Sequence, residues 1–136
     1  MIIKKILKKK IKFYNQKILK NYPNQLYPMF SWLKKLNLKN PIIIDVGSNV
    51  GLYSLCYSKI YKGSKIYSFE PEKNNFNFLK KNIHLNKGKD IFIFNYGISD
   101  KKETKTISIP IPSQHHRYNK NINSGLFSFF GKGKYK

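Results

Sequence analysis

Apolar residues follow two different spacings along this chain of 136 residues. Near the N-terminus they recur close to every 3.6 residues, at Ile2, Ile3, Ile6, Leu7, Ile11, Tyr14 and Ile18. This spacing predicts an amphipathic helix whose opposite face carries lysines. Pro23 and Pro28 interrupt the pattern. We therefore expect residues 1–40 to form a basic helical leader and residues 41–136 to form a separate domain.

From residue 41 onward the apolar residues gather in short runs separated by helical segments. Runs of strand length lie at 42–46, 65–69 and 91–96, and helical spacing lies at 51–60 and around Leu79. This alternation of strands and helices predicts right-handed crossovers and a parallel sheet with the strand order 3-2-1. We expect a partial Rossmann-like α/β fold with flanking helices, in which the first strand is buried on both faces.

Acids and glycines follow the first two predicted strands. The segment "DVGSNVG" places Asp45 near the end of the first strand, and Glu70 ends the second strand just before Pro71. Proline suits the first turn of a helix, which is where we expect Pro71. Ligands of parallel α/β sheets bind beyond the carboxyl ends of the strands, so both acids lie at the candidate site. There Asp45 can hold the loop and complement a cationic ligand.

The spacing of the glycines distinguishes among nucleotide-like ligands. The dinucleotide fingerprint G-x-G-x-x-G, aligned on Gly47, meets Asn49 and Leu52 at its other two glycine positions. A P-loop is excluded because no Gly-Lys-Ser/Thr follows. S-adenosylmethionine carries no phosphate. Gly47 and Gly51 would let the chain pass close to this cofactor, and Glu70 could accept hydrogen bonds from its ribose hydroxyls. NAD is the less favoured cofactor.

Three segments carry a resemblance to a known family. "IIIDVGSNVGLYSL", "YSFEPEKNNFNFLKKNIHLN" and "FNYGISDKKETKTISI" resemble the FkbM family of S-adenosylmethionine-dependent methyltransferases, over about residues 41–110. The resemblance implies O-methylation of a hydroxyl on a sugar, a lipopolysaccharide-type glycan or a natural product. It implies that the cofactor lies at Asp45, Gly47, Asn49, Gly51 and Glu70. We expect the same cofactor to be lined by Ser48, Tyr53, Pro71 and Gly97.

Members of this family continue well beyond the length of this chain. The resemblance therefore implies a truncated methyltransferase, of which these residues are the N-terminal, cofactor-binding part. The catalytic base is unknown, because the adjacent His115 and His116 lie in a polar loop where surface histidines are ordinary. We assign no metal site, since no cysteine or acid flanks that pair.

The net charge of +21 raises the question of an anionic partner. Of the 27 basic residues 26 are lysine, whereas proteins that recognise nucleic acids favour arginine, so no specific nucleic acid is expected. AT-rich codons for Lys, Asn and Ile account for much of the charge. The alternative function is a non-enzymatic module that docks on an anionic membrane surface through residues 1–20. A leading helix packed on the domain explains the same pattern.

Cysteine use and hydropathy suggest where the protein resides. Cys56 is the only cysteine and no apolar run is long enough to span a membrane, so we expect a cytoplasmic protein, peripheral at the membrane through its leader. The alternation from Ile107 to Ile111, which includes Pro110, predicts a strand at the sheet margin. The strand at 42–46 would then keep an exposed edge, which invites self-association or a C-terminal partner chain.

Overall fold

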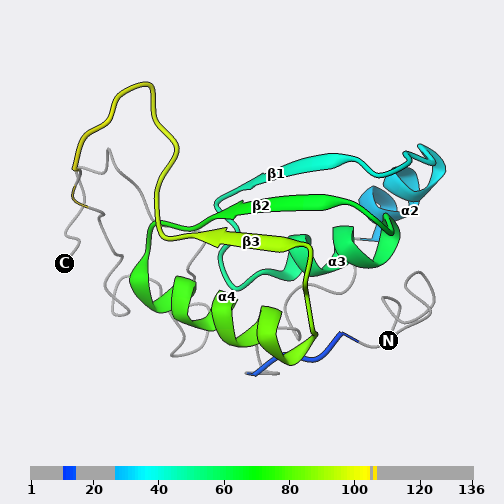
Figure 1. Cartoon of the computed structure of the whole chain (residues 1–136), viewed down its shortest axis with the longest axis horizontal. Coiled ribbons are helices and arrows are strands. Elements are labelled where there is room, and N and C mark those ends of the chain that lie inside the picture. Colours follow the sequence, from blue (N-terminus) through cyan, green and yellow to red (C-terminus); the bar gives the residue numbers. More distant parts are fainter. Residues whose placement is uncertain (1–10, 15–26, 105, 107–136) are drawn as a thin grey trace, which may run out of the picture. The chain divides into compact units, whose positions relative to one another are not determined.

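The computed structural model describes residues 11–14, 27–104 and 106. Its helices and strands are α2 (Tyr27–Lys35), β1 (Ile42–Val46), α3 (Leu52–Ile60), β2 (Lys65–Phe69), α4 (Lys73–Leu85) and β3 (Ile91–Phe94) (Figure 1). The chain divides into two compact units, residues 1–98 and 99–136, and all six elements belong to the first. The strand predicted at 107–111 and the two adjacent histidines lie outside the described residues.

The three strands form one parallel sheet in the order β1-β2-β3. Ile42 of β1 stands opposite Lys65 of β2, and Ile66 of β2 stands opposite Ile91 of β3. The predicted parallel sheet, its strand order and the Rossmann-like α/β class are confirmed. Helices α3 and α4 both lie on one face of the sheet (Figure 1). Two crossovers of the same hand that step in the same direction place their helices on the same side.

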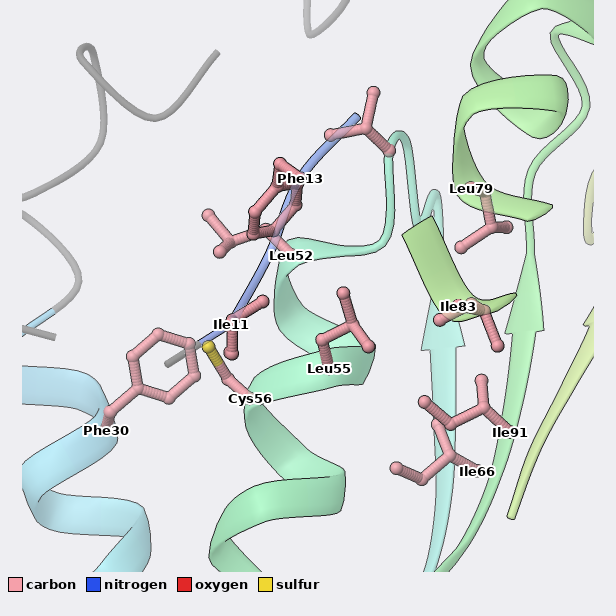
Figure 2. Close-up of a cluster of buried hydrophobic side chains, with 11 residues drawn as sticks. Ile11, Phe13, Phe30, Leu52, Leu55, Cys56, Ile66, Leu79, Ile83 and Ile91 are labelled. Atoms are coloured by element: carbon pink, nitrogen blue, oxygen red, sulfur yellow. The ribbon is translucent and has the colours of Figure 1, made fainter. Parts of the chain in front are cut away.

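The core of the first unit lies between this sheet face and the helices. Leu55 and Cys56 of α3, Ile66 of β2 and Leu79 of α4 are fully shielded from solvent (Figure 2). Helix α2 joins this core through Phe30, which is also buried. Burial raises the pKa of Cys56 to about 12, so its thiol stays protonated at neutral pH and serves packing.

The opposite face of the sheet carries no helix from the described part of the chain. Ile42, Ile44 and Val46 of β1 are 71%, 66% and 59% exposed. The expectation that this strand is buried on both faces is therefore wrong for the described residues, because α3 and α4 occupy the other face and β1 is an edge strand. On the same open face, Tyr67 of β2 stacks on Phe92 of β3 with ring centroids 5.2 Å apart.

The described N-terminal segment, residues 11–14, is not helical. Ile11 and Phe13 are buried, and the residues after each of them are exposed, an alternation typical of extended chain. The predicted leading helix is therefore wrong at these four residues, because α4 binds their backbone through side-chain amides. The rest of that helix, at 1–10 and 15–26, lies outside the described residues. Within the described ranges, no helix has the length and apolarity needed to cross a membrane.

Candidate functional site

A tight loop connects β1 to α3 at the carboxyl end of the sheet. Three of its residues have a left-handed backbone: Gly47 with φ 76°, Asn49 with φ 50° and Gly51 with φ 85°. Glycine adopts this conformation freely, and asparagine tolerates it better than most other residues. The backbone of the loop therefore explains the spacing G-x-N-x-G, with asparagine meeting the same conformational need as a glycine.

This loop is fastened to the end of β2. The N–H groups of Gly47 and Ser48 both donate to the carbonyl oxygen of Phe69, each at 2.9 Å. The N–H of Asn49 donates to Oε2 of Glu70 at 2.7 Å. The structure thus brings together the glycine loop after β1 and the acid after β2, two features that the sequence placed at a common site.

Glu70 lies inside this junction, with 4% of its surface exposed. Its Oε1 accepts the N–H of Glu72 at 3.0 Å, and the side chain of Asn75 donates to the same carboxylate. Burial raises the pKa of the Glu70 carboxyl, and these hydrogen bonds partly oppose the rise. Since a carboxylate offers about four acceptor positions, the bonds from Asn49, Glu72 and Asn75 leave about one position for a ligand hydroxyl.

Asp45 joins β1 to both the loop and α3. Its Oδ2 accepts from the hydroxyl of Ser54, which also bonds to the hydroxyl of Ser68 at 2.8 Å. Its backbone carbonyl accepts from the hydroxyl of Ser48 at 2.8 Å. Burial raises the pKa of the Asp45 carboxyl, and the bonds from the serines oppose that rise. The described part of the chain leaves no buried side-chain nitrogen or oxygen without a partner.

Sequence reasoning missed Ser68 as a member of this polar cluster. Ser68 stands opposite Asp45 in the register of β1 and β2, so both side chains project from the same sheet face. The sequence carried one signal for it. In the run "KIYSF", Ser68 comes two residues after Ile66, so both lie on the same buried face of the strand. A serine on the core side of a strand requires a hydrogen-bond partner, and Ser54 is that partner.

The two glycines of the loop meet different surroundings. A Cβ added to Gly51 would lie 2.6 Å from Cδ1 of Leu79 in α4, so this position is closed by the core. A Cβ added to Gly47 would meet nothing within 4 Å. Gly47 therefore faces open space beside Glu70, which makes it the glycine that a ligand can approach. Gly51 serves the packing of α3 on α4.

Replacing Gly51 with alanine should lower the free energy of unfolding by about 1–3 kcal/mol, from the left-handed backbone and the collision with Leu79. Gly47→Ala is the matched control, because it has the same sign of φ and open surroundings. Its cost should stay at about 1 kcal/mol, from the backbone alone. Urea denaturation of both variants measures the difference, and equal costs would contradict the separate roles.

The remaining predicted site residues lie nearby in different settings. Helix α4 begins at Lys73, after the N-cap Glu72, whose carboxylate accepts the N–H of Asn74 at 2.9 Å. The expectation that Pro71 lies in the first turn of this helix is therefore wrong, because the cap follows it. Tyr53 packs on the ring of Phe30 in α2, with centroids 5.7 Å apart.

Gly97 lies beyond the end of β3 and is exposed. Nothing in the described contacts assigns it, Tyr53 or Pro71 to a ligand, so their role at the cofactor stays a prediction.

Comparisons with known proteins match this chain over part of its length. No protein-family model matches the chain. Over 47 residues, the chain is 43% identical to "Methyltransferase sdnD" of Sordaria araneosa. That match spans 35% of this chain and 18% of the relative, so it covers about a fifth of the relative's length.

The solved structures that this chain resembles are also matched over only part of their length. Precorrin-6y C5,15-methyltransferase from Geobacter metallireducens has 14% identity and a TM-score of 0.48, over 57% of this chain and 41% of that one. TYW2 from P. horikoshii in complex with MeSAdo has 25% identity and a TM-score of 0.45, over 52% and 27%. Trm5 from Methanocaldococcus jannaschii in complex with adenosine has 26% identity and a TM-score of 0.43, over 57% and 23%.

Proposed function

We propose that this chain is the cofactor-binding part of an S-adenosylmethionine-dependent methyltransferase of the FkbM type. The supporting observation is how the loop uses its hydrogen-bond donors. The N–H groups of Gly47, Ser48, Asn49 and Gly51 all donate to acceptors within the protein. A pyrophosphate needs such donors free at the end of a strand. A cofactor without phosphate therefore suits this loop better than a dinucleotide does.

The rest of the site agrees with that choice. Glu70 supplies a carboxylate at the end of β2, where hydroxyl groups of a ribose would donate to it. Gly47 faces open space beside Glu70. Asp45 adds negative charge beneath the loop, which favours a cationic sulfonium. The sequence relative named as a methyltransferase supports the same class of reaction.

The acceptor that we propose is a hydroxyl on a sugar, a glycan or a natural product. This choice rests on the resemblance of residues 41–110 to the FkbM family. Methyl transfer is an in-line displacement, so the role of the described residues is to position the cofactor's methyl group.

The alternative, docking on an anionic membrane through residues 1–20, loses support from the described residues. Ile11 belongs to the apolar spacing of the predicted surface helix, whereas Phe13 lies off it. Both side chains are buried in the core of the unit, at 6% and 3% exposure. They are therefore unavailable to lipid in this conformation.

Titration calorimetry of the full chain tests the proposed cofactor. We expect S-adenosylhomocysteine, the product form of the cofactor, to bind more tightly than NAD, because four N–H groups of the loop already donate within the protein. Tighter binding of NAD would overturn the assignment. Absence of binding by both ligands would refute a cofactor site in this chain.

A further inference from the structure

Two asparagines, Asn82 in α4 and Asn86 at its C-cap, bond the backbone of the N-terminal segment. Asn86 accepts the N–H of Lys12 at 2.9 Å through Oδ1 and donates to the carbonyl of the same residue at 2.6 Å through Nδ2. Asn82, one helical turn earlier, accepts the N–H of Tyr14 at 2.8 Å. Because these bonds involve main-chain atoms, they depend on the extended backbone and not on the side chains at 12 and 14.

Residues 11–14 cover a surface of α3 and α4, called the groove below, and the side chains of Ile11 and Phe13 pack into the core there. Ile11 lies beside Cys56, and Phe13 lies beside Leu52, both on α3 (Figure 2). Ile11 and Phe13 are 6% and 3% exposed, and both belong to the same buried cluster as α3 and α4. The groove thus bonds the backbone at Lys12 and Tyr14 and buries the side chains of Ile11 and Phe13. Proteins that bind extended peptides use the same combination of main-chain bonds and side-chain pockets.

Asn82 also reaches the candidate cofactor loop. Its Nδ2 donates to the carbonyl oxygen of Val50 at 2.8 Å, while its Oδ1 holds Tyr14. The side chain is 1% exposed with the segment in place, so no water competes with either partner while the segment is docked. Val50 lies between Asn49, which Glu70 holds, and Gly51, which packs on α4. One buried amide therefore bonds both the N-terminal segment and the loop.

We infer that the groove between α3 and α4 is a binding site for an extended peptide of the pattern apolar-x-apolar, filled by residues 11–14 of the same chain. Asn82 couples occupancy of this groove to the conformation of residues 47–51. When the segment leaves, the Oδ1 of Asn82 loses its donor, and the amide no longer has a single orientation that favours Val50. The loop then loses its hydrogen bond to Asn82, while Gly51 still packs on Leu79.

This coupling has a reciprocal consequence for the cofactor, and that part rests on the proposed function. If the ordered loop is the form that binds the cofactor, a docked segment raises cofactor affinity. By linkage the bound cofactor must then hold the segment in its groove by the same factor. Asn82 is in this sense a positioning residue, because it acts on the site through Val50.

Hydrogen exchange of the full-length chain without any ligand tests the coupling directly. Phe13→Ala removes one of the buried side chains, and Asn86→Ala removes the hydrogen bonds to Lys12 without touching the loop. We expect both variants to exchange faster at residues 11–14 and also at 47–51. Lys12→Ala is the matched control, since its side chain is exposed and its backbone bonds remain. It should exchange as the wild-type chain does at both places.

Unchanged exchange at 47–51 in a variant whose segment exchanges faster would overturn the coupling. Unchanged exchange at 11–14 in both variants would overturn the groove itself. If Phe13→Ala fails to fold, Asn86→Ala decides alone, because it leaves Ile11 and Phe13 unchanged.

A second measurement separates this inference from the proposed function. Binding of S-adenosylhomocysteine to Asn86→Ala should weaken about fivefold or more, the low end of usual coupling between sites. The bound ligand should also slow exchange of the Tyr14 amide in the wild-type chain. If the wild-type chain binds no S-adenosylhomocysteine, the proposed function fails, while the ligand-free exchange experiment still decides the coupling. Equal affinity of both chains would contradict the link to the cofactor.

Discussion

Replacing Glu70 with alanine should weaken binding of S-adenosylhomocysteine by about 1–3 kcal/mol, or roughly 5- to 150-fold in Kd. The substitution removes the charged acceptor that we assign to the ribose hydroxyls. It also frees the Asn49 N–H, which Glu70 holds at 2.7 Å, so the loop loses its attachment to β2. Titration calorimetry on the variant and the wild-type chain measures the change.

Glu72→Ala is the matched control for that measurement. Glu72 is a second buried acid of the same turn, and it caps α4 through the N–H groups of Asn74 and Asn75. Its loss should lower stability by about 1 kcal/mol, as the loss of a helix cap does, and should leave Kd nearly unchanged. Equal weakening by both variants would show that Glu70 acts through folding of the turn and not through the cofactor.

Lowering the pH should weaken cofactor binding, as the substitution of Glu70 by alanine does. Burial raises the pKa of this carboxyl above its usual value. The ionised form, which accepts hydrogen bonds best, is therefore lost at a higher pH than for an exposed glutamate. Cofactor affinity should be full above this raised pKa and should fall as the pH decreases through it. An affinity that rises on acidification would contradict the role of the carboxylate.

The second large effect concerns turnover, which we expect to be undetectable for this chain alone. A general base contributes about 10²- to 10⁴-fold to a transfer that removes a proton from the acceptor. In the described part of the chain, the carboxylates at this end of the sheet are Asp45, Glu70 and Glu72, and all three accept hydrogen bonds from the fold. We therefore assign none of the three to the acceptor's proton. Transfer of labelled methyl groups to sugar acceptors should equal the rate without protein.

The control for turnover is the binding measurement on the same preparation. Binding of S-adenosylhomocysteine without methyl transfer is the expected combination. Methylation of a hydroxyl acceptor by the purified chain would contradict this prediction.

The first two strands of the sheet follow from local sequence patterns. Ile42–Val46 and Lys65–Phe69 form strands with the predicted bounds, because each is a short apolar run ended by glycine or proline. The meeting of the glycine loop with Glu70 was also predictable, since parallel strands bring their carboxyl ends to one edge. These features depend on neighbours in the chain and on one rule of connection.

Features set by contacts between distant residues were not predictable in this way. The different roles of Gly47 and Gly51 depend on where Leu79 of α4 packs. The polar cluster of Asp45 required the register that brings Ser68 opposite it. A spacing pattern shows neither where Leu79 packs nor which residues stand opposite each other in the sheet.

The N-terminal segment shows how two periodicities can compete. Ile11 and Tyr14 fit a helical spacing, while Ile11 and Phe13 fit the alternation of an extended chain. The amides of Asn82 and Asn86 decide in favour of the extended form, because they bond its backbone. Those residues lie 68 and 74 positions away, beyond the range of any local pattern.

Because apolar side chains are exposed on the open face of the sheet, ionic strength should determine whether the chains self-associate. Ile42, Ile44 and Val46 are exposed on β1, an edge strand of the described sheet, and such strands can pair with another chain. Repulsion between chains of charge +21 opposes that pairing, and it extends over about 30 Å at 0.01 M salt but only about 8 Å at 0.15 M. Concentrated salt, the usual means of stripping nucleic acid from so basic a protein, would also let these faces meet. Dilute, low-salt buffers are therefore where a monomer should be sought.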